Sequence, residues 1–570
     1  MNRNTESHFS LTPTVNIGRS KFDRSFDMKT TFNTGDLIPI YCSDVLPGDS
    51  IKMRMSEIVR MQTPIAPVMD NGYLDTYFFF VPNRLIWDHF KAFMGENDTA
   101  PWTQTNEYTI PQIIAPATGW KKGSLADYFG YQTKIGSYKA SALPFRAYVK
   151  IWNDWFRDEN LKNPCYMSTG DADIQGTDKT DLGALYDYVT DTEKGAAPCK
   201  AAKLHDYFTS CLPGAQKGTA VRIPLGSRAP IVGGNVESAG IPSGFTVDSN
   251  LIDKNLGFGY NLASAGNDFL FDKDTGAVMS ATKVIGLETD LSNAVGATVN
   301  QLRQAFAIQK YYEKDALFGS RYIESVRAHF GVVNPDFRVQ RSEYLGGKRI
   351  PININQVIQT DATGNGIRPT YVDPENPSPA TLTWESIDKT PQGNAAAYSV
   401  TQDSNSDLFN HSFTEHGWII GLAVVRTDHG YQQGLNKMFI RKKKFDFYTP
   451  EFANLGNVGV LNKEIYLDGT SADEEVFGYQ EAWADYRYQP NIVTGEMRSN
   501  YDLSLDIWHW ADDYSTRPYL DSDWIDEPKE NVERTLAVQD QDQFFGDFYF
   551  GAIWTRPMPL YSIPGLIDHH

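Results

Sequence analysis

Two short segments of this 570-residue sequence carry metal-ligating residue types at close spacing. His411–His416 (HSFTEH) resembles the inverted zinc-protease motif H-x-x-E-H but has one residue too many, so the outer histidine would not share a helical face with the Glu-His pair. Asp171–Gly176 (DADIQG) opens like a calcium loop, but Leu182 stands at the twelfth position, where a bidentate Glu is required. Neither segment predicts a metal site.

The other catalytic signatures are incomplete or missing. Gly346–Arg349 (GGKR) lacks the upstream glycine and the following Ser or Thr of a phosphate-binding loop. Asp272–Gly276 (DKDTG) is typical of a turn, and the His569-His570 pair stands at the end of the sequence, where fraying is expected. No H-E-x-x-H or G-x-S-x-G motif occurs, and nothing selects a particular carboxylate pair for glycoside hydrolysis. We therefore predict no catalytic residue, no metal ligand and no cofactor.

One basic and aromatic cluster remains as a candidate binding site. Arg441–Lys444 (RKKK) precedes Phe445–Tyr448 (FDFY), and we expect a strand here, which would send alternate cations to opposite faces. Basic side chains beside aromatic rings are typical of a surface that follows phosphates and stacks bases. Lysines are also typical of a solvated strand edge, where they discourage unwanted pairing. The residues leave both interpretations open.

Size and composition indicate a large globular protein. The chain exceeds the limit of about 250–300 residues for one simple core, so it contains several domains or one scaffold with large insertions. Hydrophobic residues make up 41% and charged residues 22%, which excludes wholesale disorder. Apolar runs such as Trp418–Val425 are far shorter than the ~20 residues of a membrane-spanning helix, so we expect no membrane insertion.

Charge and cysteine content narrow the class further. The net charge of −19 argues against binding nucleic acid by bulk attraction but leaves room for a local basic face. Residues 501–570 hold 14 acidic and 4 basic residues, whereas residues 301–350 hold 9 basic and 5 acidic, which predicts two chemically distinct faces. The four cysteines form no CxxC pair, and Met1–His8 lacks the apolar stretch of a secretory signal. We expect a protein made in the cytoplasm without a disulfide scaffold.

Short, scattered strands dominate the expected secondary structure. Leu74–Val81, Trp418–Val425 and Phe445–Tyr448 are β-branched or aromatic and are bounded by turn residues. Gly95–Lys122 and Asp361–Gln402 are rich in Pro, Gly, Asn, Thr and Asp, and we expect long loops there. Because an eight-stranded sandwich needs only about 100–200 residues, most of the chain must lie in its connections.

Three helices are expected against this background, over Arg84–Phe93, Pro144–Arg157 and Thr298–Ala316. The second places Phe145, Val149, Trp152 and Phe156 on one stripe, and the third does the same with Leu302, Ala305, Ile308 and Tyr312. We predict that both stripes lie in a core.

The segment 226–296 differs in composition, with eleven glycines and no Trp. Interspersed Val, Ile, Leu and Phe favour a large excursion stabilised by neighbours over a disordered linker. No internal repeat of fixed period is present, which argues against a repetitive fibrous protein.

Several motifs in sequence order resemble the major capsid protein of gokushoviruses, small single-stranded DNA phages of the Microviridae. The most specific is Arg556–Asp568 (RPMPLYSIPGLID), near the end of the sequence. The others are Arg19–Phe26, Gly35–Pro39, Tyr207–Gly218, Asn300–Lys310, Arg321–Glu324, His329–Val332, Tyr431–Asn436 and Leu461–Tyr466. The resemblance spans nearly the whole chain.

The resemblance implies a mainly β fold, an eight-stranded antiparallel viral jelly roll with very long inserted loops and a few short helices. Residues 1–570 would form one capsid subunit in a T=1 icosahedral shell around a circular single-stranded DNA genome. Segment 226–296 stands where the family has its variable insertion, which forms threefold protrusions and contributes to attachment to a host receptor. A separate small basic protein accompanies the DNA in the family. A shell subunit needs no active site, in agreement with the absence of a complete catalytic motif from the sequence.

The candidate site residues follow from this expectation. Because segments 1–40 and 550–570 are expected to be extended tails at subunit contacts, we predict inter-subunit contacts at Arg556, Pro557, Pro559, Tyr561 and Pro564. Contacts to DNA on the inner face are predicted for Arg3, Arg19, Lys21, Arg24, Arg441, Lys442, Lys443 and Lys444. The host-facing aromatic residues of the insertion would be Phe245, Phe258, Tyr260, Phe269 and Phe271.

One alternative stays open on the residues alone. A β-sandwich that binds or cleaves carbohydrate would also carry many Trp, Tyr and Asp residues in its loops.

Overall fold

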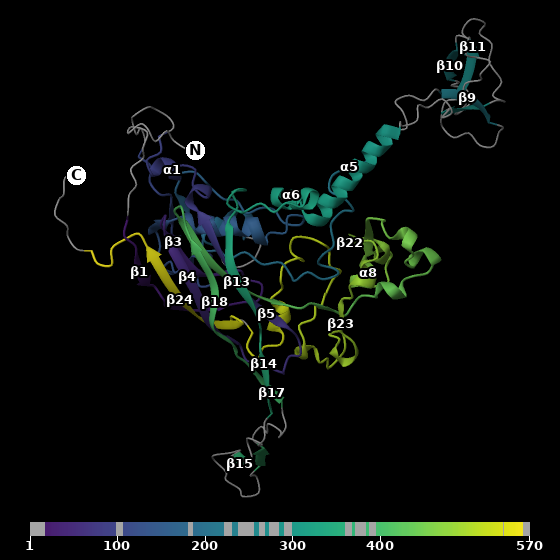
Figure 1. Cartoon of the computed structure of the whole chain (residues 1–570). Helices are drawn as coiled ribbons and strands as arrows, with labels where there is room; N and C mark the ends of the chain where they lie inside the picture. The colour runs from purple at the N-terminus through teal and green to yellow at the C-terminus, as the bar shows by residue number, and fades with distance from the viewer. Residues whose placement is uncertain are drawn as a thin grey trace. The chain divides into compact units, whose positions relative to one another are not determined.

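The structure is a computed structural model of the chain (Figure 1). It describes residues 17–97, 107–179, 186–219, 221, 231–236, 256–260, 268–272, 284–289, 299–358, 367–370, 383–386, 395–539 and 541–562. The chain divides into two compact units, the larger made of Met1–Ala215 with Arg321–His570 and the smaller of Gln216–Ser320.

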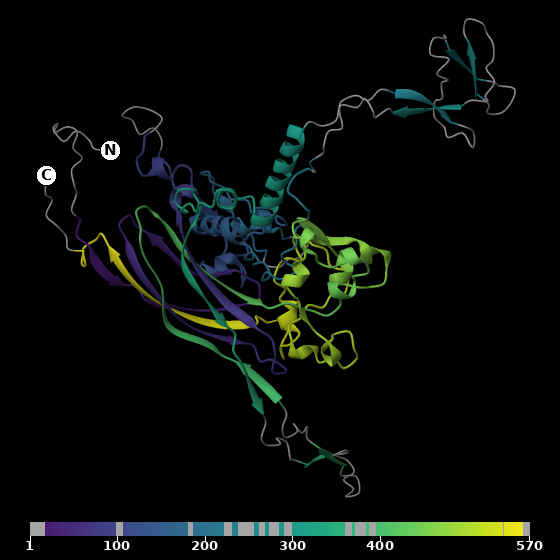
Figure 2. The same cartoon turned by 45° about the vertical axis from the view of Figure 1, so that its right-hand side comes forward.

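Two antiparallel sheets form the centre of the larger unit (Figures 1 and 2). The first contains β1 (Ser20–Asp23) and β2 (Phe26–Phe32), both paired with β24 (Phe544–Arg556), followed by β4 (Ser50–Met61) and β18 (Thr401–Ser412). The second contains β13 (Glu343–Pro351), β5 (Gly72–Pro82), β19 (Gly417–Thr427) and β3 (Ile38–Val45), in that order.

Apolar side chains from both sheets pack together in one core. In β4, Ile51, Met53 and Met55 are buried whereas Lys52 and Arg54 face solvent, and β24 alternates in the same way. Most residues of β5 and β19 are buried on both faces, which explains their nearly uninterrupted apolar sequences. The chain is therefore mainly β, with antiparallel sheets packed as a β-sandwich.

A second core covers the opposite face of the second sheet, where Phe79 and Leu422 meet helix α3 (Leu143–Ile151). α3 has Pro144 in its first turn and continues as a π-helix over Trp152–Phe156. The predicted core stripe of this helix is confirmed for Phe145, Val149 and Trp152, which are buried, whereas Phe156 is half-buried against the same core. The same region contains α1 (Phe90–Phe93), α2 (Leu125–Tyr128), α4 (Tyr188–Asp191), β6 (Gln112–Ile114), β7 (Lys139–Ser141) and β8 (Ile174–Gln175).

A third, smaller core includes Phe208, Tyr431, Ile465 and Phe477. Short elements surround it, namely β20 (Gly430–Tyr431), β21 (Asn457–Leu461), α7 (Asn462–Ile465), β22 (Val476–Glu481), α8 (Ala484–Arg487) and β23 (Asn491–Ile492). The larger unit also holds α6 (Tyr322–Phe330), α9 (Glu530–Glu533) and the antiparallel pairs β14 (Ile354–Ile358) with β17 (Ala395–Ser399) and β15 (Ile367–Thr370) with β16 (Thr383–Ser386).

The smaller unit encloses the predicted insertion 226–296. It contains the antiparallel pairs β9 (Ile231–Val236) with β12 (Val284–Thr289) and β10 (Leu256–Tyr260) with β11 (Asp268–Asp272), and the long helix α5 (Val299–Phe318). The helix was predicted, but the prediction that its stripe lies in a core is wrong. Ala316 is its one buried residue, and Ile308 is 37% exposed. Periodicity marks an apolar stripe without telling whether the surface that covers it belongs to the same chain.

Two further expectations are corrected. The helix expected over 84–93 is divided into a 3₁₀ turn at Asn83–Leu85 and α1, because the Asp88 N–H donates to the Thr169 carbonyl at 3.0 Å instead of continuing the helix. The loops expected over 95–122 and 361–402 include the strands β6 and β15 to β17 and the start of β18, each too short to outweigh the surrounding turn residues.

No metal site is indicated by either segment that opened the sequence search. Asp171 accepts a hydrogen bond from Trp87 Nε1 at 2.7 Å and pairs with His89, and Glu415 pairs with Arg84. Among the described residues, no group of three or more His, Cys, Asp and Glu side chains could hold a metal ion. All four cysteines are free thiols. No helix in the described ranges is both long and apolar enough to cross a membrane.

Candidate functional site

The basic cluster Arg441–Lys444 lies beside the third core, and its predicted strand is wrong. Residues 441–443 have no regular structure and Lys444–Asp446 form a 3₁₀ turn. The reason is local, since the Asp446 carboxylate accepts the backbone N–H groups of Lys442 and Lys443, both at 2.7 Å. These two N–H groups are therefore not available to pair with a neighbouring strand. The same two hydrogen bonds lower the pKa of Asp446.

Arg441 is held inside the protein. Its guanidinium forms an ion pair with Asp485 and lies 4.2 Å from the ring centroid of Tyr486. Only 10% of its side chain is exposed. Because its charge is already compensated, Arg441 is better placed to fix the loop than to bind a phosphate.

The three lysines that follow are exposed and differ from Arg441 in their partners. In the described part of the chain, no carboxylate lies within 4.0 Å of the Nζ atoms of Lys442, Lys443 or Lys444. Lys444 Nζ lies 4.7 Å from the ring centroid of Phe445, which is itself 61% exposed. The cluster therefore presents three available positive charges next to an exposed aromatic ring.

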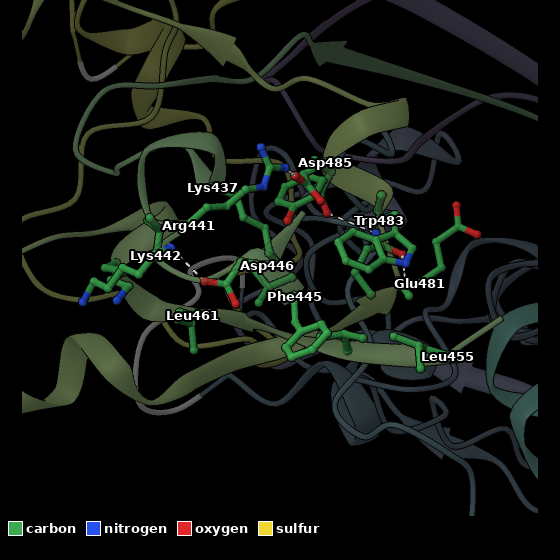
Figure 3. A pocket seen from close by; sticks show the side chains of 18 of the residues that line it. Lys437, Arg441, Lys442, Phe445, Asp446, Leu455, Leu461, Glu481, Trp483 and Asp485 are labelled. Carbon is green, nitrogen blue, oxygen red and sulfur yellow. Dashed lines mark hydrogen bonds and ion pairs between the residues drawn. The ribbon is translucent and has the colours of Figure 1, made fainter. Parts of the chain in front are cut away.

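An apolar cavity of about 370 Å³ opens beside the lysines (Figure 3). Its apolar lining includes Phe445, Leu455, Leu461 and Trp483. The Trp483 backbone is left-handed (φ 67°), and its indole N–H donates to the Phe452 carbonyl at 2.7 Å, which fixes the ring. A cavity of this size with aromatic walls suits a flat aromatic group.

Each acidic side chain around this cavity has an ion-pair or hydrogen-bond partner. Asp485 pairs with Arg441, Glu481 with Arg487, Glu474 with Lys463, and Asp446 caps the lysine loop. Lys442 lines the cavity, and Lys443 and Lys444 follow it in the sequence, so an apolar interior lies next to an exposed cation. Such an arrangement can hold a base while lysines contact its phosphates. Leu455 and Trp483 were missed by the sequence search because they are distant from the lysines in sequence and carry no motif.

The structure places the N-terminal basic candidates elsewhere. Lys21 belongs to β1 and is exposed, as is Arg19, and Arg24 Nη1 donates to Ser43 Oγ at 3.3 Å. β1 lies on one side of the β-sandwich, and α8, whose Asp485 pairs with Arg441, lies on the opposite side (Figures 1 and 2). The predicted basic residues therefore do not form one patch. Arg3 lies outside the described residues.

The predicted contact residues at the C-terminal end behave differently from one another. Arg556 pairs with Asp49 at 3.2 Å and donates to the Asp44 carbonyl, so its partners lie within the chain. Pro557 is half-buried, whereas Pro559 and Tyr561 are exposed, Tyr561 by 73%. Pro564 lies outside the described residues. The N-terminal segment also finds partners in its own chain, because β1 and β2 pair with β24.

The aromatic candidates of the insertion lie on one hairpin. Phe258 and Tyr260 belong to β10, opposite Leu270 and Asp268 of β11. Phe269 and Phe271 belong to β11 and are opposite Gly259 and Gly257. Phe245 lies outside the described residues.

Comparison with known proteins assigns the family. Residues 10–371 and 374–566 match the family described as "Capsid protein (F protein)". The chain belongs to this family of phage capsid proteins. It is 41% identical to capsid protein VP1 of Spiroplasma virus 4 over 568 residues, covering 98% of this chain and 97% of that protein.

Two further relatives agree. Capsid protein VP1 of Bdellovibrio phage phiMH2K is 39% identical (99% of this chain, 98% of that protein), and capsid protein VP1 of Chlamydia phage 1 is 37% identical (98% of each). The resemblance to gokushovirus capsid proteins is confirmed. The chain is a structural, non-enzymatic component of a virion shell built from many subunits, and the carbohydrate-active alternative is not favoured.

Proposed function

We propose that copies of this chain assemble into a closed T=1 icosahedral shell, with the β-sandwich as an eight-stranded jelly roll. The observation that carries the proposal is the family match over nearly the whole chain, so the sandwich and its connections belong to one capsid subunit. Large apolar side chains exposed on the isolated chain also support it, including Leu503 (98%), Phe330 (78%) and Phe439 (68%). Contacts between copies would bury such side chains.

The test is direct imaging of the purified full-length protein by negative-stain electron microscopy, together with its mass in solution. Uniform closed particles of sixty copies are expected. Monomers or open aggregates under conditions that keep the chain folded would reject the proposal.

The shell would enclose a circular single-stranded DNA genome, and Lys442, Lys443 and Lys444 are the proposed contacts. Their unpaired charges would bind phosphates, and the adjoining cavity would take an unstacked base against Phe445 and Trp483. Arg3, Arg19, Lys21 and Arg24 remain proposed as a separate contact. Because the chain is acidic, a small basic phage protein would supply further neutralising charge.

DNA binding is tested with the triple variant K442Q/K443Q/K444Q. Each lost phosphate contact to single-stranded DNA changes the slope of log K against log salt by about 0.7, so we expect the slope to fall by about 2. The control K91Q/K121Q/K139Q removes the same charge from exposed lysines elsewhere and should keep the wild-type slope. Equal slopes for the two variants would reject this contact.

The insertion 226–296 is proposed to face outward and contribute to attachment to a host receptor. Intact particles that lack the insertion should lose adsorption to host cells. Unchanged adsorption would remove this role.

Residues 559–562, which are exposed, and the segment that follows them are proposed to lie along a neighbouring subunit. A deletion of residues 557–570 keeps Arg556 and its pair with Asp49 and should reduce the yield of intact particles. Normal particle yields from this deletion would reject the contact.

A further inference from the structure

A pocket at the C-terminal end of the α3 region has no role in the proposals above. Its volume is about 370 Å³, and four cationic side chains line it, Lys150, Arg157, Arg321 and Arg341. Arg321 opens the Arg321–Glu324 motif and is the first residue of the larger unit after the smaller one. Four cations close together are unexpected in a chain of net charge −19, because like charges repel each other.

Backbone carbonyls at the end of the π-helix fix the arginines. Arg321 Nη2 donates to the Arg157 carbonyl at 2.7 Å and to the Asn153 carbonyl at 3.3 Å. Arg341 Nη2 donates to the Asp154 carbonyl at 2.5 Å, and its guanidinium lies 3.6 Å from the ring centroid of Trp155. The guanidinium groups are therefore held in place before any ligand arrives, which reduces the entropic cost of binding.

The carboxylates of the site are already engaged. Asp154 accepts hydrogen bonds from Lys150 Nζ and from the Ser342 N–H and hydroxyl, all at 2.9 Å. Glu324 pairs with Arg321 at 3.1 Å. These contacts compensate two of the four cations.

Arg157 and Arg341 have no carboxylate of the described residues in direct contact, although Arg157 Nη1 donates to the Lys162 carbonyl at 2.8 Å. No carboxylate of the described residues lies within 4.0 Å of either guanidinium, and the buried Nε–H of each has no hydrogen-bond partner. Burial lowers the pKa of both groups and the like charge of Arg321 adds to this effect. Nearby carboxylates, Asp336 and Asp154 at Arg341 and Glu159 and Asp158 at Arg157, offset it in part. Half-buried cations without a direct ion pair are costly, so an external anion would be stabilised here.

The acid-rich part of the same sequence offers matching anions. Exposed carboxylates at Asp502, Asp521, Asp523 and Glu530 have no cation within 4.0 Å in the described chain. The pocket rim also carries Tyr322, which is 71% exposed. Arginine and tyrosine are the residue types enriched at the energetic centres of protein interfaces.

We propose that this pocket receives a side-chain carboxylate from residues 501–530 of a neighbouring copy of the chain, which pairs with Arg157 and Arg341. The contact rests on the proposed shell, because it requires identical copies side by side. It joins the basic pocket of one subunit to the acidic C-terminal part of the next, so that two chains of net charge −19 attract each other locally.

A cryo-electron microscopy reconstruction of assembled particles tests the proposal. A neighbour's carboxylate within 4 Å of Arg157 or Arg341 is the expected result. DNA phosphate density in the pocket, or solvent alone, would overturn the inference while leaving the shell intact. If the chain forms no particles at all, the proposed function fails as well.

Variants give an independent test. R157Q should reduce particle yield by about tenfold or more, because it leaves a neighbour's carboxylate unpaired in an interface. R338Q, which removes an exposed arginine outside the pocket, is the matched control and should assemble normally. Equal yields for R157Q and R338Q would contradict the proposal.

Charge reversal separates the contact from misfolding. R157E should abolish assembly, and one of D502R, D521R, D523R or E530R in the same chain should restore it. The R157E subunits must unfold at the same temperature as the wild-type subunits. If they do and none of the four second substitutions restores assembly, the inference is also overturned.

Discussion

The core of the β-sandwich and the cluster around His429 are both buried, but different interactions stabilise them. Between the sheets, Phe78, Phe548 and Trp554 have no exposed surface and pack against other apolar side chains. Around His429, the buried groups are charged. Its Nδ1 lies 3.0 Å from Asp512 and its Nε2 lies 3.0 Å from Glu527.

Further polar groups complete this charged cluster. Lys203 Nζ lies 3.1 Å from Asp512, and Asn531 and Tyr514 also donate to that carboxylate. Burial alone would disfavour a charged imidazole, but Asp512 and Glu527 raise the pKa of His429 to about 10. The cluster links residues that are distant in sequence through ionic contacts, whereas the sandwich relies on apolar area.

The sandwich core and the charged cluster should therefore respond differently to pH and salt. Apolar burial does not depend on ionisation, so the sandwich should keep its stability over a wide range of pH and salt. The charged cluster depends on one proton and on complete pairing. Leu503, nine residues before Asp512 in the sequence, is 98% exposed, whereas the outward-facing Phe545 of the sandwich is 41% exposed.

The largest expected effect is in the sandwich. Phe548→Ala should lower the free energy of unfolding by about 3–5 kcal/mol, because it removes a fully buried ring from a packed core. Urea unfolding of dissociated subunits measures the change. The neighbouring Phe545 faces outward and is 41% exposed, so Phe545→Ala is the control and should cost much less. Similar losses for both variants would contradict the assigned core.

The next effect is the pH dependence of the charged cluster. The pKa of His429 is raised from 6.5 to about 10, so the folded state binds one more proton than the unfolded state between those values. The stabilisation is complete below pH 6.5 and is lost as pH rises towards 10, by at most about 1.4 kcal/mol per pH unit.

Unfolding experiments from pH 6 to 10 on wild-type protein and on His429→Gln measure this slope. The variant should be less stable at pH 6, since it leaves two buried carboxylates short of a cation, and its stability should fall less as pH rises. Parallel curves for the two proteins would show that His429 does not carry the extra proton.

The smallest effect on the subunit is expected at Leu503. This residue is 98% exposed and has a left-handed backbone (φ 60°), which costs a non-glycine residue about 1 kcal/mol or more. Leu503→Gly should therefore raise subunit stability by about 1 kcal/mol while reducing particle assembly, if the side chain packs on another copy. Unchanged assembly would show that Leu503 is not a contact residue.

The sequence predicted the parts of the fold that depend on local pattern. Apolar runs identified β5 and β19, and the aromatic stripe of Phe145, Val149 and Trp152 identified α3 and its buried face. The family resemblance supplied the functional class. The strand and helix signals each lie within one short continuous segment, so no tertiary information was needed for them.

Other features depend on contacts between distant residues and could not be read locally. The ion pair with the distant Asp485 draws Arg441 into the protein, where a strand was expected. Glu57 lies at an inward position of β4 and is buried beside Lys348 of β13 at 2.7 Å, where alternation alone predicts an apolar residue. The cavity beside the lysines and the counter-ion balance around Arg157 are likewise visible only once the chain is folded.

The most direct test of the account is the state of association of the purified, folded chain. Mass measurement and electron microscopy of the same preparation should show closed particles of uniform diameter that dissociate into subunits retaining the β-sandwich. A stable, folded monomer that never forms closed particles, at any protein concentration or salt, would contradict the claim that this chain functions as a shell subunit.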